Sequence, residues 1–231
     1  MDKITHYGWQ DTTNFVSPQL LHVNSCGKQI CQRETSRGGF TLLRENGRVD
    51  YHLLYIIEGR CILTRDGRKR TLEAGEGVFY KPNERQEYHF PAEVDTATFW
   101  LHFSGSAAAD VLKKTGLWDD AFFCLRHPQT TEQLFSELIR EQQLKPPQFE
   151  WMSAGLLLSI LAAIARDIST AGEPNPYERI LPALSAMQEH PEQNADLAAY
   201  AAMCHLSKSR FVHLFTAFTG SAPHHYRLSL R

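Results

Sequence analysis

"YHLLYIIEGRCILTRDGRKRTLEAGEGVFY", residues 51–80, contains the clearest structural pattern in the chain. It opens with an apolar run at 51–59 that does not alternate with polar residues, as in a strand buried on both faces inside a barrel or sandwich. Asp66 and Gly67 then separate two strand-like runs, and this dipeptide favours a tight hairpin because both residues tolerate a positive φ. Gly75 and Gly77 predict another bend. The stretch therefore predicts short strands joined by tight turns.

Further apolar runs flank this stretch on both sides. They lie at 19–26, 40–44, 87–90 and 96–103. About eight short strands with glycine-containing turns are typical of a small barrel or jelly roll. We therefore expect a β-barrel that ends near residue 104.

Helical spacing replaces the strand pattern after residue 105. A helix is predicted over 130–144 because it begins with threonines, places Leu134, Leu138 and Ile139 on one face, and is followed by prolines. The next segment, 149–168, is the most apolar of the chain, but its uncharged run of about 15 residues is shorter than the roughly 18–20 that cross a bilayer. We expect a buried helix there and no membrane span. Strands followed by helices predict an α+β fold.

The composition is that of an ordinary globular protein. The 231 residues are 42% hydrophobic and carry a net charge of −2, which fits one or two domains. The five cysteines form no CxxC motif, so we expect reduced thiols that act as small apolar side chains. The N-terminus lacks the apolar run of a signal peptide, which favours a cytoplasmic protein.

The segment "TAGEPNPYE", 170–178, is small, polar and interrupted by two prolines. These features are typical of a linker. We therefore expect a first domain at 1–170, a linker at 171–177 and a second domain at 178–231. Three helices are predicted in the second domain.

A short turn joins the last two of these predicted helices. Asp196 or Asn194 can cap the first of them with a side-chain oxygen, and Leu197, Tyr200 and Ala201 share one of its faces. Ser207 can cap the second in the same way. The predicted buried face of the second helix consists of Phe211, Leu214, Phe215 and Phe218.

The start of the second helix carries side chains that the core does not need: Lys208, Ser209, Arg210, Val212 and His213. In a helix-turn-helix, the second helix enters the major groove of DNA with its N-terminal residues leading. From Cys204 to Arg231 there are four Lys or Arg residues and no Asp or Glu, so positive charge is concentrated around this helix. The same pattern also fits a three-helix bundle with a solvated basic face.

Residues 196–231, "DLAAYAAMCHLSKSRFVHLFTAFTGSAPHHYRLSLR", resemble the first helix-turn-helix of AraC-type (AraC/XylS family) transcription regulators. The stretch "VDYHLLYIIEGRCIL" and the strands after it, up to "FWLHFSG", are similar to the cupin-like sensor barrel of the same family. The resemblance implies a ligand-responsive regulator that binds double-stranded DNA, needs no cofactor and is not an enzyme. It also implies a homodimer paired through the helices at 130–168.

The resemblance assigns DNA contacts to the start of the second helix. The implied residues are Ser207, Lys208, Ser209, Arg210, Val212 and His213. His213 stands where the family most often has arginine, and His205 stands where it usually has glycine in the turn. The family carries two helix-turn-helix units, whereas this sequence stops at Arg231, where the helix joining them would begin. We therefore expect a DNA-binding part reduced to one unit.

The resemblance also places a small-molecule effector, such as a sugar, inside the barrel. Arg44 would donate hydrogen bonds to hydroxyls or to a carboxylate, Trp100 would stack on an apolar face of the ligand, and Tyr88 would add a hydroxyl. His102 follows Trp100 by two residues, so it should point to the same face of the barrel.

Two alternative functions also fit parts of the sequence. One is a truncated sensor or dimerisation protein without specific DNA binding. The other is a metal-dependent cupin enzyme, which needs histidines and a carboxylate converging from adjacent strands. The sequence has Gln86 where such enzymes carry a histidine, and His52, His89 and His102 lie on different predicted strands. We therefore expect no metal site.

Overall fold

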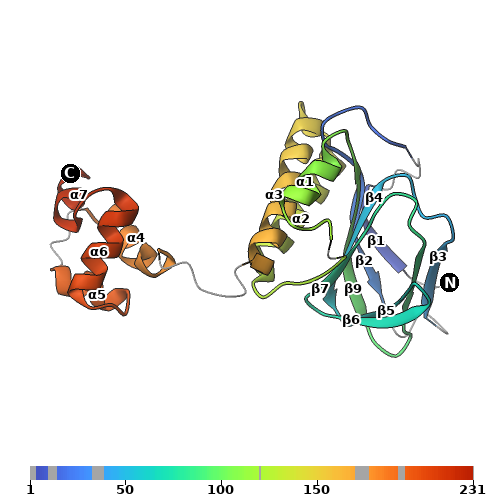
Figure 1. Cartoon of the computed structure of the whole chain (residues 1–231), viewed down its shortest axis with the longest axis horizontal. Coiled ribbons are helices and arrows are strands. Elements are labelled where there is room, and N and C mark those ends of the chain that lie inside the picture. Colours follow the sequence, from blue (N-terminus) through green and yellow to red (C-terminus); the bar gives the residue numbers. More distant parts are fainter. Residues whose placement is uncertain are drawn as a thin grey trace. The chain divides into compact units, whose positions relative to one another are not determined.

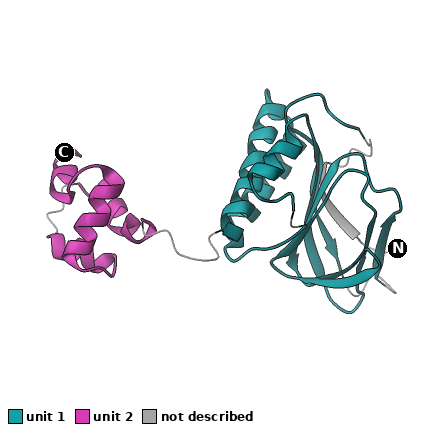
Figure 2. Ribbon diagram, in the orientation of Figure 1, with its two compact units in different colours: residues 1–169 teal, residues 170–231 magenta. Residues whose placement is uncertain are grey.

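The computed structural model describes residues 4–9, 15–32, 39–119, 121–169, 177–191 and 196–230. The chain divides into two compact units, residues 1–169 and residues 170–231 (Figure 2). Each unit has its own hydrophobic core and is described separately.

Two antiparallel sheets build the first unit (Figure 1). The larger sheet has the order β1 (Ile4–Trp9), β2 (His22–Cys31), β9 (Thr96–Ser104), β4 (Tyr51–Glu58), β7 (Glu76–Tyr80) and β10 (Phe122–Cys124). The smaller sheet has the order β3 (Phe40–Arg44), β8 (Gln86–Phe90), β5 (Arg60–Arg65) and β6 (Arg68–Glu73). The strands β2-β9-β4-β7 opposite β3-β8-β5-β6 form a jelly roll, as the sequence predicts. The strands β1 and β10 are additional to the expected set.

Two of the turns test the predictions made for glycines. Asp66 and Gly67 connect β5 to β6 with φ values of 51° and 72°, which confirms the tight hairpin. Gly75, with φ of 91°, makes the expected bend between β6 and β7. Gly77 does not belong to that bend but lies within β7, where an added Cβ would come within 2.2 Å of the Phe123 ring. Glycine at 77 thus makes room for a packing contact with β10.

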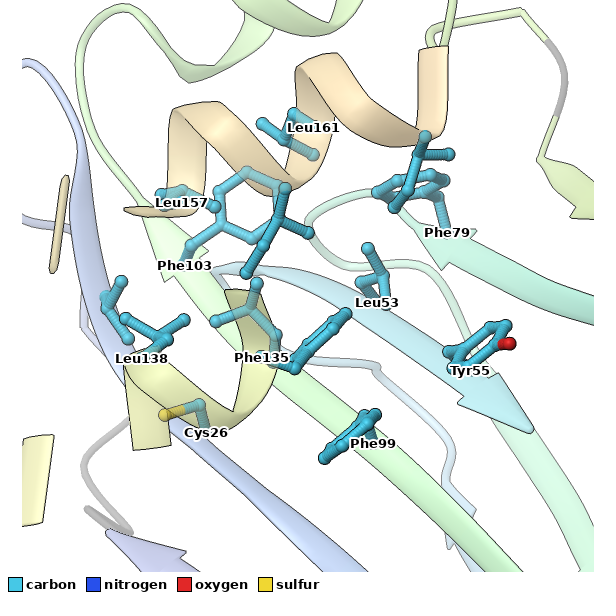
Figure 3. Packing of buried hydrophobic residues seen from close by; sticks show 14 of the residues in the cluster. Cys26, Leu53, Tyr55, Phe79, Phe99, Phe103, Phe135, Leu138, Leu157 and Leu161 are labelled. Carbon is cyan, nitrogen blue, oxygen red and sulfur yellow. The ribbon is translucent and has the colours of Figure 1, made fainter. Parts of the chain in front are cut away.

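Helices α1 (Ala108–Lys114), α2 (Pro128–Leu144) and α3 (Phe149–Ser169) lie beside the outer face of the larger sheet (Figure 1). Phe135 of α2 stacks on Phe99 of β9 with ring centroids 4.8 Å apart, and Leu157 and Leu161 of α3 face the same core (Figure 3). The central strands are therefore buried on both sides, which explains the apolar run at 51–59. The helix α2 begins at Pro128, two residues earlier than predicted, because proline suits the first turn, where no N–H donor is needed.

Only one face of α3 is buried, so the prediction of a buried helix is correct for that face alone. The opposite face exposes Trp151, Met152 and Leu158 by 73%, 58% and 45%. By length and composition alone, α3 could cross a membrane. In the structure its other face packs on the sheet through Leu157 and Ile160.

The second unit consists of a short 3-10 helix η1 (Glu178–Ile180) and the helices α4 (Leu181–Glu189), α5 (Leu197–Met203), α6 (Lys208–Thr219) and α7 (Pro223–Ser229). Its core joins α4, α5 and α6 through residues that include Met187, Tyr200 and Phe211. The helix α7 is additional to the three helices that the sequence predicts for this unit.

Two apolar residues of this unit are more exposed than predicted. Leu197 is 39% exposed because it is the first residue of α5, at the edge of the core. Phe218 is 47% exposed because it lies in the last turn of α6, where Tyr177 covers one side of its ring.

Candidate functional site

Strand register places the side chains between the two sheets in rows. On the larger sheet, His52 of β4 lies opposite Tyr80 of β7 and His102 of β9. Leu54, two residues further along β4, lies opposite Trp100. One row is therefore polar and aromatic, and the next is apolar.

The smaller sheet continues this division. Arg44 lies opposite Gln86 in the β3–β8 pair, and Leu42 lies opposite Tyr88. Arg44 is half-buried and donates a hydrogen bond to Gln86 Oε1 at 2.7 Å. Burial raises the pKa of Tyr88 to about 12, although the positive charge of Arg44 acts in the opposite direction. The polar side chains of both sheets thus meet at one end of the sandwich.

We call this group the buried polar cluster. It consists of Arg44, Arg48, Asp50, His52, Tyr80, Gln86, Tyr88 and His102.

Two neutral histidines form the centre of the cluster. The rings of His52 and His102 stack with centroids 4.3 Å apart and planes 18° apart, and Tyr80 stacks on the other face of His52 at 5.6 Å. Burial lowers the pKa of His52 well below its ordinary value, and the neighbouring His102 adds to the effect. Burial also lowers the pKa of His102, although Asp50 opposes this shift. Both rings are therefore uncharged at neutral pH.

Asp50 supplies the negative charge of the cluster and is fully buried. It accepts hydrogen bonds from Arg48 at 2.7 and 2.8 Å and from Asn24 at 2.9 Å, and His102 Nδ1 lies 3.5 Å away. Burial alone would raise the pKa of Asp50, but the hydrogen bonds and charge of Arg48, together with the neighbouring His102 ring, hold it well below its usual range.

Several polar atoms of the cluster are buried without a hydrogen-bond partner among the described residues. They are both ring nitrogens of His52, the hydroxyl of Tyr80, Nε2 of Gln86 and Nδ1 of His102. A buried polar atom without a partner costs roughly 1–3 kcal/mol, so native proteins rarely tolerate a group of them. A polar ligand entering this end of the sandwich would supply the missing partners.

All four residues implied as ligand contacts lie at this end of the interior. Arg44, Tyr88 and His102 belong to the cluster, and Trp100 lies beside His102 with ring centroids 5.7 Å apart. The expectation that Trp100 and His102 share a face is correct. His89 points away from this interior and bonds Thr41 at 2.8 Å on the outer face.

Sequence reasoning missed His52, Tyr80 and Gln86 as members of the site. His52 and His102 lie on different strands, and only the register of β4 against β9 brings them together. In the described part of the chain, no group of three or more His, Cys, Asp or Glu side chains is arranged to hold a metal ion.

The second unit contains the predicted helix-turn-helix, formed by α5 and α6. Asp196 caps α5 by accepting the N–H of Ala199 at 2.8 Å, whereas Asn194 lies outside the described residues. Ser207 caps α6 by accepting the N–H of Arg210 at 3.3 Å. The turn between them places His205 at a φ of 52°, the conformation that glycine adopts most easily.

The residues implied as DNA contacts differ in exposure. Those at solvent are Ser207, Lys208, Ser209, Arg210 and His213. Val212 is half-buried and lines an apolar groove of about 370 Å³ together with Tyr200, Pro223 and Arg227. The surface at the start of α6 therefore presents two cations and several hydrogen-bonding groups, but little apolar area.

Comparisons with known proteins agree with this architecture. The profile of the AraC-like ligand binding domain matches residues 41–161. The chain is 28% identical over 172 residues to the Msm operon regulatory protein of Streptococcus mutans, covering 72% of this chain and 57% of that protein. It is 26% identical over 207 residues to the MmsAB operon regulatory protein of Pseudomonas aeruginosa, covering 85% and 66%. The chain thus spans less than two thirds of the length of these relatives.

Among solved structures, the AraC-like transcriptional activator CuxR is similar with a TM-score of 0.43 and 11% identity, over 90% of this chain and 74% of that one. ToxT from Vibrio cholerae O395 is similar with a TM-score of 0.39 and 11% identity, over 89% and 97%.

The chain belongs to the family defined by the AraC-like ligand binding domain. The resemblance to AraC-type regulators is confirmed. Both curated relatives are named as operon regulatory proteins.

Proposed function

We propose that this chain is a cytoplasmic transcription regulator that binds a small polar metabolite between its two sheets and double-stranded DNA through α6. The observation that supports this most strongly is the group of unpartnered polar atoms in the buried polar cluster. Such atoms favour a polar ligand over a purely structural core. The neutral sugar implied by the resemblance stays one candidate for that ligand.

The start of α6 is suited to DNA. Lys208 and Arg210 are exposed and carry the positive charge needed to contact phosphates, and the N-terminus of the helix adds its own dipole. His213 is exposed and offers one donor and one acceptor when neutral, so it can contact a base edge less strongly than an arginine that bonds guanine twice. We expect modest sequence discrimination from the start of α6.

We also propose that the chain forms a homodimer through the exposed face of α3. The apolar surface of this helix consists of Trp151, Met152 and Leu158, which the other described residues leave exposed to solvent. Burying such a surface against a second copy removes it from water and presents two copies of α6 to DNA. Two units bind a two-part site more tightly than one because the second contact is intramolecular.

The metabolite regulates DNA binding only if it binds two arrangements of the protein with different affinity. We therefore expect substitutions in the cluster to alter the response to the metabolite and substitutions in α6 to alter DNA binding itself. We propose the domain boundaries 1–170, 171–177 and 178–231 as the division between these two activities.

The test is a reporter gene placed under the DNA upstream of this protein's own gene, in a host that lacks that gene. The wild type, Arg210→Ala/His213→Ala and Trp100→Ala are compared across growth on different carbon sources. We expect the α6 variant to lose regulation entirely and Trp100→Ala to lose only the response to growth conditions. Equal behaviour of all three would contradict the proposal and favour a sensor or dimerisation protein without specific DNA binding.

Elemental analysis of the purified protein distinguishes this proposal from a metal-dependent enzyme. A metal-dependent enzyme would retain stoichiometric metal after purification.

A further inference from the structure

The buried polar cluster contains one positive charge that has no matching carboxylate. Arg44 is half-buried, donates a hydrogen bond to the neutral Gln86, and forms no ion pair with a described residue. The acids adjacent to it, Glu45 and Glu87, are bound by Arg85 at 2.7 and 2.5 Å. A guanidinium that is partly withdrawn from water favours an anion as its partner.

The carboxylate within the cluster is not available to Arg44. Asp50 accepts two hydrogen bonds from Arg48 and one from Asn24, and it lies beside His102. Among the described residues, the cluster therefore has no second carboxylate with which Arg44 could form an ion pair.

The unpartnered atom directly beside Arg44 is a hydrogen-bond donor. Gln86 Nε2 can only donate, whereas the Tyr80 hydroxyl and the neutral His52 can each donate or accept. A ligand oxygen that only accepts therefore fits the guanidinium of Arg44 and the amide of Gln86 together.

The neighbouring row of side chains sets the rest of the ligand. Trp100 and Tyr88 are 9% and 6% exposed, and Leu54 lies opposite Trp100. The strand position facing Trp100 on β2 is Gly27, which contributes no side chain. An apolar or flat group of the ligand would therefore meet the Trp100 ring from the side on which β2 contributes no side chain.

We propose that the effector is a small organic acid whose carboxylate binds the guanidinium of Arg44 and the amide of Gln86, with its apolar part against Trp100. This inference rests on the proposed function, because it names the chemical class of the ligand at the same site.

The test compares acids with their uncharged amides on the purified full-length chain. The probes are C3–C6 monocarboxylates, their 2- and 3-hydroxy derivatives and benzoate, each beside its amide, together with pentoses and hexoses. Binding is measured by thermal shift and by quenching of tryptophan fluorescence, since a ligand that binds only the native state raises the melting temperature. We expect at least one acid to bind and its amide to bind roughly 10- to 100-fold more weakly.

Gln86→Glu is the decisive variant because it keeps the shape of the side chain and pairs Arg44 with an internal carboxylate. We expect it to weaken binding of the acid by roughly 10- to 100-fold, with Lys69→Met, which removes an exposed cation of β6, as a control that leaves binding unchanged. Arg44→Met is the second variant, and its circular dichroism is checked against the wild type.

The proposal of a carboxylic acid would be overturned by an amide or sugar that binds as tightly as any acid and binds Gln86→Glu equally well. The proposed function would then stay intact. The absence of binding by every acid in the series would also overturn it, and the reporter assay would then decide the proposed function separately.

Discussion

Replacing Asp50 by Asn removes the negative charge of the buried polar cluster while keeping the shape of the side chain. Asp50 has no exposed surface and accepts hydrogen bonds from Arg48 at 2.7 and 2.8 Å and from Asn24 at 2.9 Å. Asparagine keeps one acceptor oxygen but carries no charge. Arg48 would then lose this negative partner while its side chain stays only 11% exposed to water.

The structure gives the expected size of the effect. Removing one partner of a fully buried ion pair costs about 3–5 kcal/mol. The remaining oxygen and the slight exposure of Arg48 reduce this, so we expect the free energy of unfolding of residues 1–169 to fall by about 2–4 kcal/mol. For a unit of this size, the melting temperature should fall by roughly 5–15 °C.

The dependence on pH follows from the lowered pKa of Asp50. As the pH falls, the Asp50 carboxylate is protonated in the unfolded state before it is protonated in the native state. The stabilisation that the Asp50 charge provides is therefore present at neutral pH and is lost as the pH falls below about 4. Asn cannot titrate. The difference between wild type and Asp50→Asn should therefore shrink as the pH falls from about 4 toward 2.

Urea unfolding followed by tryptophan fluorescence measures this difference. All four tryptophans lie within residues 1–169, so the signal reports the first unit alone. Glu45→Gln is the matched control because Glu45 pairs with Arg85 at the surface, where an ion pair contributes little. A loss below about 1 kcal/mol for Asp50→Asn, or a loss equal to that of the control, would refute the role assigned to the buried ion pair.

Three further predictions concern the cores and the cap of α6. Acidification from about pH 7.5 to 5.5 should destabilise the first unit, because the pKa values of His52 and His102 are lowered in the native state and the unfolded state therefore binds protons first. A free energy of unfolding in urea that stays constant across this pH range would contradict the burial of the pair. Phe135→Ala should lower the free energy of unfolding by about 3–5 kcal/mol, whereas Leu144→Ala, at an exposed position of the same helix, should change it little. Equal losses would refute the packing of Phe135 of α2 against the larger sheet. Ser207→Ala should lower the stability of the second unit by about 1 kcal/mol, measured by native-state hydrogen exchange of the α6 amide protons, and a Ser209→Ala control that loses as much would argue against the cap.

Local patterns in the sequence predicted much of the fold. Hairpin and cap residues act over two to four positions, so Asp66-Gly67, Asp196 and Ser207 could be assigned without knowledge of the tertiary structure. Burial was harder to predict at the ends of helices. Leu197 and Phe218 follow the apolar period, but the core does not extend to the terminal turns that carry them.

The candidate site could be predicted only in part. Arg44, Tyr88, Trp100 and His102 were implied by a family resemblance, whereas their meeting with His52 depends on which residues of β4, β7 and β9 lie opposite one another. A shift of one residue in any of these pairs would turn His52 toward the helices. Register of this kind depends on the whole sandwich and could not be predicted from residues 51–80 alone.

The central claim is that α6 gives this protein a preference for particular DNA. The direct measurement is fluorescence anisotropy of the intact protein on labelled DNA from upstream of its own gene, beside an unrelated duplex, at two salt concentrations. Arg210→Ala/His213→Ala is the matched variant. We predict tighter binding to the upstream DNA that weakens with salt and is lost in the variant. Equal binding to both duplexes, or binding unchanged in the variant, would contradict the assignment of α6 as the DNA-reading helix.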